Sequence, residues 1–255
     1  QRENNPYCVD SLHLQHGADE ENSPDTPWSI RRIRSISGEK LIYSRKGEYM
    51  IIKNMPSGPL MVNTYFVYDE NDKKGFIVDP GGYNRQLTQE AINLGVEVEY
   101  IILTHGHSDH IGGVNDHLTD FPNAKVVVSA ADKKMLQDAK LNMSAMVFGK
   151  GIAVEPDILV KQNDTLQVGS ITLKFLMTPG HTPGGMCILA DDVLFSGDTL
   201  FYGSIGRTDF PESSFEELAK SIHQQLFELP DQTKVYPGHM GTTTIGFEKR
   251  NNPFV

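Results

Sequence analysis

The amino-acid sequence predicts a mixed α/β domain, and three observations support this prediction. Short β-type runs recur along the chain, and several of them end in a turn that contains glycine. Stretches with helical periodicity lie between some of these runs. The 255 residues, 38% of them hydrophobic, are enough to bury a real core in one large domain or two small ones.

The individual elements follow from the local hydrophobic pattern, because alternation or a short apolar run marks a strand and a 3.6-residue period marks a helix. In the first half of the chain the pattern predicts strands over 62–68 and 75–78, a helix over 84–94, a strand over 100–103, a helix over 111–118, a strand over 125–128 and a helix over 130–139. In the second half it predicts strands over 171–177, 193–195 and 234–236 and a helix over 213–227. Ser213 is expected to cap this last helix, with Glu216 placed for a capping box.

Two segments differ in composition from the rest. Residues 1–46 are polar and are expected to form a flexible N-terminal extension, with 47–255 as the main domain. A basic patch at Arg31, Arg32 and Arg34 leaves a targeting remnant or a nucleic-acid contact as alternatives. The section 140–164 is rich in Met and broken by Gly, so it is either a flap over the site or part of the core.

Charge, hydropathy and cysteine content limit the partners and the compartment. The formal net charge of -10 disfavours a nucleic-acid partner, and no apolar run is long enough to cross a membrane. Cys8 and Cys187 lie in different contexts and indicate no disulfide framework. We therefore expect a cytoplasmic enzyme with a small-molecule substrate.

The segment from Thr104 to Gly113 places four metal-binding side chains within six positions, directly after the apolar run 100–103. They are His105, His107, Asp109 and His110. In an extended chain alternate residues point the same way, so we expect the first three to converge and His110 to point elsewhere. One segment can then serve two metal ions.

Three further candidates each follow a β-type run and a turn that contains glycine: His181, Asp198 and His239. With the first cluster they supply five His and two Asp, enough for two metals that share a carboxylate. Imidazole and carboxylate ligands without cysteine suit zinc, iron or manganese in an open, water-bearing site. The remaining histidines, His13, His16, His117 and His223, have no partner nearby in sequence and are left out of the site.

Two metal ions close together favour hydrolysis, because even one bound zinc lowers the pKa of water from about 16 to about 7. A carbonyl polarised by a metal is then open to attack by hydroxide, as in an ester, thioester or amide. Asp109 is interpreted either as a ligand that orients the hydroxide or only as a hydrogen-bond partner of a ligating His. Asp79, at the end of another strand, is either such a partner or a turn cap.

This ligand set resembles that of the metallo-β-lactamase superfamily, and specifically its glyoxalase II-like hydrolases of the short, single-domain hydroxyacylglutathione hydrolase type. The resemblance covers residues 49–255, with the His-x-His-x-Asp-His motif followed by the later His, Asp and His. It implies a four-layer αββα sandwich with the metals at the sheet edge. It also implies that one metal is held by His105, His107 and His181, the other by Asp109, His110 and His239, and that Asp198 bridges them.

The resemblance predicts a dinuclear metal-dependent hydrolase that cleaves a thioester such as S-lactoylglutathione by attack of a metal-bridging hydroxide. Asp109 and Asp198 are the expected catalytic residues, and zinc is the preferred metal, with iron or manganese as alternatives. Arg207 lies where the long enzymes place a basic residue facing glutathione, although it can equally form a loop salt bridge. The tyrosines of that pocket are replaced by Asp209 and Gly241.

Two other functions are compatible with the same ligands. One is a mononuclear iron persulfide dioxygenase, whose relatives keep these His and Asp residues while filling one site. The other is a metal-binding protein without turnover. The sequence does not predict the oligomeric state.

Overall fold

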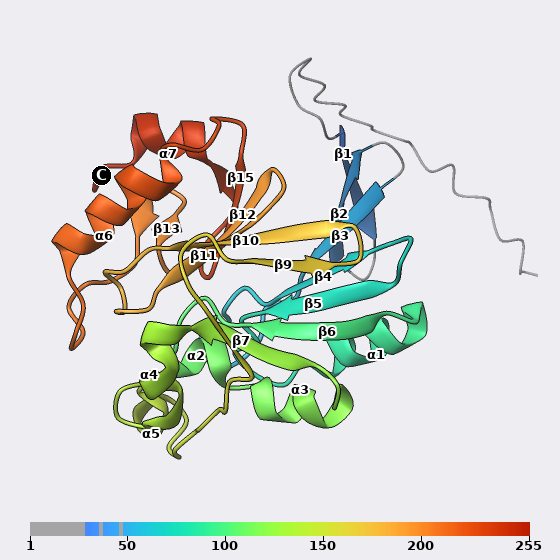
Figure 1. Ribbon diagram of the computed structural model, residues 1–255, viewed down its shortest axis with the longest axis horizontal. Coiled ribbons are helices and arrows are strands. Elements are labelled where there is room, and N and C mark those ends of the chain that lie inside the picture. Colours follow the sequence, from blue (N-terminus) through green and yellow to red (C-terminus); the bar gives the residue numbers. More distant parts are fainter. Residues whose placement is uncertain (1–28, 36–37, 46–47) are drawn as a thin grey trace, which may run out of the picture.

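Two β-sheets packed face to face form the centre of the protein, as a computed structural model of residues 29–35, 38–45 and 48–255 shows (Figure 1). Within these residues the first sheet has the order β1 (Ser29–Ser35), β2 (Gly38–Arg45), β3 (Glu48–Asn54), β4 (Tyr65–Asp69), β5 (Lys74–Val78), β6 (Glu97–Ile102), β7 (Lys125–Ser129) and β8 (Ile158–Val160). Strands β1 to β5 pair antiparallel and strands β5 to β8 pair parallel.

The second sheet is mostly antiparallel. Its order is β16 (Thr243–Thr244), β15 (Lys234–Pro237), β12 (Val193–Gly197), β11 (Met186–Ala190), β10 (Ile171–Met177) and β9 (Thr165–Val168). Strands β12 and β15 are its parallel pair. A small hairpin of β13 (Leu200–Phe201) and β14 (Ser204–Ile205) follows β12.

Helices cover the outer face of each sheet. The first sheet is associated with α1 (Arg85–Leu94), α2 (Ser108–Ile111), α3 (Val114–Asp120), a 3-10 turn at Ala130–Asp132, α4 (Lys133–Gln137) and α5 (Ser144–Val147). The second is covered by α6 (Phe215–Ser221), its π-helical continuation Ile222–Leu226, and α7 (Ile245–Asn251). Figure 1 shows α1 and α3 beneath the first sheet and α6 and α7 on the far side of the second.

Three hydrophobic clusters separate these layers, because successive side chains of a strand face opposite sides of the sheet. On β4, Val67 faces the second sheet, whereas Phe66 faces the helices. Phe195 of β12 meets Tyr65 between the sheets at a centroid distance of 5.2 Å. Leu218 and Ile222 of the C-terminal half pack on the outer face of the second sheet. The predicted four-layer αββα sandwich is therefore confirmed.

The predicted helix over 111–118 is wrong in its extent, because it is two short helices broken at Gly112 and Gly113. A Cβ on Gly112 would lie 2.3 Å from the carbonyl oxygen of Gly81, and one on Gly113 would lie 2.4 Å from the carbonyl of Gly82. Only glycine permits this close approach of two backbones. The first of the two helices, α2, begins at Ser108 and therefore includes Asp109 and His110.

Two further predictions can be compared with the described residues. Ser214, not Ser213, caps α6 by accepting a hydrogen bond from the backbone N–H of Glu217 at 3.3 Å. The section 140–164 contributes Phe148 to the core on the helix side of the first sheet, while Met146 is 71% exposed.

Most of the predicted N-terminal extension lies outside the described residues, so its flexibility and the boundary near residue 46 stay predictions. The described part of it forms β1 and β2, and β2 pairs with β3 of the main sheet. None of the helices that the structure describes has the length and apolar character needed to cross a membrane.

Candidate metal centre

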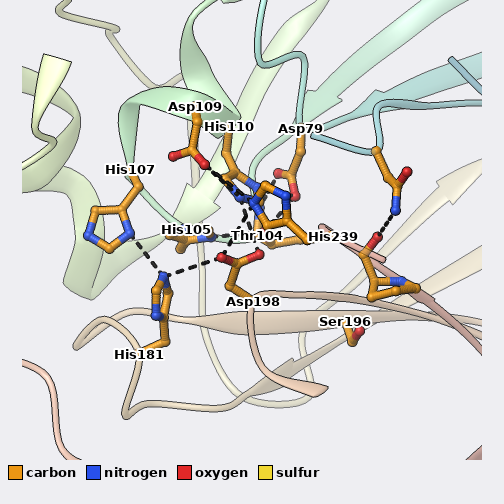
Figure 2. Close-up of polar contacts among 12 residues, drawn as sticks. Asp79, Thr104, His105, His107, Asp109, His110, His181, Ser196, Asp198 and His239 are labelled. Atoms are coloured by element: carbon orange, nitrogen blue, oxygen red, sulfur yellow. Dashed lines mark hydrogen bonds and ion pairs between the residues drawn. The ribbon is translucent and has the colours of Figure 1, made fainter. Parts of the chain in front are cut away.

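The seven predicted ligands meet at one edge of the sandwich, where segments from both sheets end (Figure 2). The first sheet supplies the motif that follows β6, and the second supplies the loops after β10, β12 and β15. The ligand atoms form three overlapping groups in which all atoms lie within 4.8 Å of one another: His105 with His107 and His181, His105 with His110 and Asp198, and Asp109 with His110 and His239.

The alternation expected within the motif is wrong, because β6 ends at Ile102 and the chain leaves the extended conformation before His105. His105 and His107 lie in the connecting loop, while Asp109 and His110 lie in α2. His110 therefore does not point elsewhere, and its ring centroid is 4.0 Å from that of His105.

The first group is the more buried one. His105, His107 and His181 are 2%, 6% and 4% exposed. Nδ1 of His107 and Nε2 of His181 are 3.0 Å apart. Nδ1 of His181 donates to the backbone carbonyl of Arg207 at 2.7 Å, which leaves its Nε2 directed at the group.

The second group opens to solvent. The side chains of His239 and Asp109 are 28% and 15% exposed, and Nε2 of His239 is 3.4 Å from Oδ2 of Asp109. His110 is fully buried, and its Nδ1 contacts Oδ2 of Asp79 at 2.9 Å. Asp79 also accepts hydrogen bonds from the backbone N–H and the hydroxyl of Thr104 at 2.8 and 2.7 Å. Of the two interpretations of Asp79, the hydrogen-bond partner of a ligand candidate is the one that the structure shows.

Asp198 lies between the two groups (Figure 2). Its Oδ1 is 3.3 Å from Nε2 of His110, and its Oδ2 is 3.6 Å from Nε2 of His181. The same Oδ2 is 3.8 Å from Nε2 of His239. One carboxylate thus reaches imidazoles of both groups.

These residues fit a pair of metal ions. Nε2 of His105, Nε2 of His110 and Oδ1 of Asp198 are buried, and although the last two atoms lie 3.3 Å apart, none of the three makes a hydrogen bond of good geometry within the described residues. Buried polar atoms almost always have a partner, so three such atoms converging on one place fit the coordination of a cation. A donor set of imidazole and carboxylate suits zinc, iron or manganese.

The electrostatics of the cluster also suit metal binding. Burial and the neighbouring imidazoles hold the pKa of His105 well below its usual value, and burial with His181 lowers the pKa of His107 to about 4. Both rings are thus neutral at physiological pH, the form that binds a metal. Burial alone would lower the pKa of His110, but the carboxylates of Asp198, Asp79 and Asp109 outweigh it and raise that pKa well above the usual value.

Exposed apolar side chains lie on two segments that meet beside His239. Leu60 and Met61, in the turn before β4, are 53% and 63% exposed, and Met240 is 59% exposed. Asn63 joins this turn to the His239 loop, because its backbone N–H donates to Gly238 O at 2.8 Å and its amide donates to Met240 O at 2.9 Å. Asn63 was not predicted as a site residue, and its only sequence signal is a polar side chain within the run 62–68 that was predicted as a strand.

Arg207 borders the first group through its backbone, and its side chain projects to solvent. The guanidinium is 66% exposed and pairs with Asp209, with Nη2 to Oδ2 at 2.7 Å. It also lies over the ring of Phe210, 4.3 Å from the centroid, and that ring contacts His107 at a centroid distance of 5.2 Å. The predicted substrate-binding role of Arg207 stays a prediction.

The remaining histidines and cysteines that the structure describes take no part in the cluster. His117 is buried beside Thr88 of α1, and His223 contacts Phe227. Cys187 is a buried core residue, where burial raises the pKa of its thiol to about 11. His13, His16 and Cys8 lie outside the described residues.

Comparison with known proteins identifies the family. The family model described as the metallo-beta-lactamase superfamily matches residues 57–239, which is more than half of the chain. The chain belongs to this superfamily. One relative is the probable metallo-hydrolase YqgX of Bacillus subtilis, which is 37% identical over 80% of this chain and 96% of its own length. Another is the hydroxyacylglutathione hydrolase GloC of Haemophilus influenzae, which is 36% identical over 81% of this chain and 98% of its own length.

Solved structures of the superfamily agree with the fold. The B3 metallo-beta-lactamase BLEG-1 has a TM-score of 0.75 at 37% identity and covers 80% of this chain and 98% of its own. TTHA1623, solved in a di-iron-bound form, has a TM-score of 0.69 at 31% identity and covers 80% of this chain and 100% of its own. ETHE1 from Myxococcus xanthus has a TM-score of 0.65 at 29% identity over 79% and 83%.

Proposed function

We propose that the protein is a dinuclear metallohydrolase that cleaves a thioester such as S-lactoylglutathione. The position of Asp198, within reach of imidazoles from both ligand groups, is the observation that carries this proposal. A ligand that two metals share must lie between the two sets of imidazoles, and the Asp198 carboxylate does. The similarity to GloC, named a hydroxyacylglutathione hydrolase, supports the thioester as substrate class.

In this proposal His105, His107 and His181 would hold one metal, Asp109, His110 and His239 would hold the other, and Asp198 would be a ligand of both. Two divalent cations, preferably zinc with iron or manganese as alternatives, would supply an activated water nucleophile and would stabilise the charge that develops on the carbonyl oxygen.

The protein's own groups orient the reactants. Asp109 is partly exposed, and although burial would raise the pKa of its carboxyl, His110 and His239 outweigh burial and lower it. Its ionised Oδ2 can therefore accept a hydrogen bond from the attacking water. Asp79 and the Arg207 carbonyl each occupy Nδ1 of one ligating histidine, which directs the opposite nitrogen of His110 and of His181 into the centre.

The substrate is expected to enter beside His239, the most exposed member of the ligand set. The apolar side chains at this edge, Leu60, Met61 and Met240, would contact the part of the substrate that lies outside the metal centre. A small organic ester or thioester fits such an entrance better than a highly charged polymer does.

A second candidate is persulfide oxidation at a single iron. The deep burial of His105, His107 and His181, compared with the open second group, favours it because the first group can hold a metal more tightly. The same residues would then bind one ion, and the second group would stay empty.

Thiol release from S-lactoylglutathione by protein reconstituted separately with zinc, iron and manganese tests the proposal, with metal content measured in the same samples. Turnover with two metals bound supports the hydrolase. Oxygen uptake with formation of sulfite and glutathione from glutathione persulfide by the one-iron form, without hydrolysis of S-lactoylglutathione, would support the second candidate. Two tightly bound metals with neither activity would instead indicate another ester or a metal-binding protein without turnover.

A further inference from the structure

Asp132 is a buried carboxylate next to the metal centre that the ligand set does not include. It ends the 3-10 turn Ala130–Asp132 after β7 and is 1% exposed. Three hydrogen bonds converge on it. Oδ2 accepts from the backbone N–H of Gly106 at 3.0 Å and from the hydroxyl of Thr182 at 2.8 Å, and Oδ1 accepts from the backbone N–H of Gly184 at 2.7 Å.

These three donors come from the two loops that carry the first ligand group. Gly106 lies between His105 and His107, while Thr182 follows His181 directly in the chain. The two loops are distant in sequence and belong to different sheets. A single carboxylate therefore fixes the spacing between the two parts of the first group.

The glycines in these loops allow the contact. A Cβ on Gly184 would lie 2.5 Å from the backbone nitrogen of Asp132 and 2.6 Å from its Oδ1, so only glycine brings that N–H within reach of the carboxylate. A Cβ on Gly106 would lie 2.9 Å from the side chain of Met135. Because Met135 belongs to α4, directly after Asp132, this segment supports the His105–His107 loop at two points.

We propose that Asp132 is the positioning residue of the first metal site and that it acts on this site selectively. All three hydrogen bonds of its carboxylate go to the loops of His105, His107 and His181. The second group has its own buried carboxylate, Asp79, which contacts His110 directly. Because Asp132 acts through ligands, its role rests on the proposed two-metal centre, and metal affinity tests it separately from turnover.

The test is Asp132→Asn, with zinc affinity and stoichiometry measured by competition with a chelator. Whichever way the new amide turns, its NH2 group faces at least one N–H or O–H donor, so a hydrogen bond is lost without a change in size. We expect one zinc to bind about 10–100-fold more weakly, the usual effect of losing a partner that orients metal ligands, while the other zinc binds as in the parent protein.

Glu248→Gln is the matched control. Glu248 is also fully buried and also accepts three kinds of donor, the Gly203 N–H, the Thr243 hydroxyl and the Asn252 amide, but none of these lies beside a ligand of the first group. This variant is expected to lose unfolding stability as Asp132→Asn does and to keep both zinc ions. Metal loss is then separated from a general loss of stability.

Ligand variants assign the affected site. In a His239→Ala background, which leaves only the first site complete, Asp132→Asn should weaken the remaining zinc about 10–100-fold. In a His181→Ala background it should leave the remaining zinc unchanged. Equal effects in both backgrounds, or parental affinity for both zinc ions in Asp132→Asn, would overturn the proposal.

Thr182→Val provides a second variant if Asp132→Asn does not fold. It removes one of the three hydrogen bonds and leaves the carboxylate in place. A smaller weakening of the first zinc alone is expected, again read in the two ligand backgrounds. Unchanged affinity at the first site in this variant would also refute the role of Asp132.

Discussion

Replacing Asp198 with alanine should remove metal from the centre and abolish most of the activity. Its two oxygens lie 3.3 Å from His110, 3.6 Å from His181 and 3.8 Å from His239, so the substitution takes a negative charge from both ligand groups at once. Removing one partner of a buried, charged pair costs about 3–5 kcal/mol. At about 1.4 kcal/mol per factor of ten, this corresponds to a loss of about 10²- to 10⁴-fold in affinity for at least one metal.

The rate should fall by a similar factor, because the proposed chemistry depends on both cations. The assay is thiol release from S-lactoylglutathione, with metal content measured after dialysis against a weak chelator. Asp231→Asn is the control, since Asp231 is an exposed carboxylate that pairs with Lys249 and should affect neither quantity. Near-normal turnover with two metals bound in Asp198→Ala would refute a shared ligand at this position.

Three other perturbations test the site and its surroundings. Arg207→Ala should raise KM for S-lactoylglutathione up to about fivefold at unchanged kcat, which corresponds to the free energy of an exposed ion pair. Asp209→Asn frees the guanidinium of Arg207 and should lower KM. Equal KM values for the parent protein and both variants in steady-state kinetics would remove Arg207 from the substrate site. Burial lowers the pKa of His117 in the folded protein, where its Nε2 accepts a hydrogen bond from the Asn84 N–H. As the pH drops below about 6.5, the unfolded chain binds a proton at this histidine before the folded protein does, so the free energy of unfolding should fall. Urea unfolding of metal-free His117→Gln should show a smaller fall over the same range, and an identical pH profile would contradict this. Chelation should lower the melting temperature of the parent protein, by the equivalent of about 4 kcal/mol if free metal exceeds Kd a thousandfold, and an unchanged melting curve would argue against tight binding.

The sequence predicted the identity of the clustered residues more successfully than their arrangement. Each ligand candidate follows a β-type run, and strands that end at the same edge of a sandwich bring such residues together. The alternation argument failed because it assumed that the strand continues past Leu103, whereas β6 ends at Ile102. Hydrophobic periodicity marks the strand but not the point where a tertiary contact ends it.

The other errors also have tertiary causes. The helix over 111–118 has a helical pattern, but it is interrupted because the backbone of Gly81 and Gly82 lies against Gly112 and Gly113. The N-cap moved from Ser213 to Ser214 because the hydroxyl of Ser213 donates to the carbonyl of Phe210 instead. Asp132 gave no signal in the sequence, since its partners are backbone N–H groups of loops that only the fold brings near it.

The metal centre connects the two halves of the sandwich as well as carrying the proposed chemistry. The closest ligand contacts all cross between the sheets: His107 with His181 at 3.0 Å, His110 with Asp198 at 3.3 Å, and Asp109 with His239 at 3.4 Å. This arrangement buries imidazoles and carboxylates whose polar atoms the described residues only partly satisfy, which lowers the stability of the fold. The cores on both sides of each sheet offset that cost, and a bound metal reverses it. The geometry that suits the proposed chemistry would therefore also make metal binding contribute to the packing of one sheet on the other.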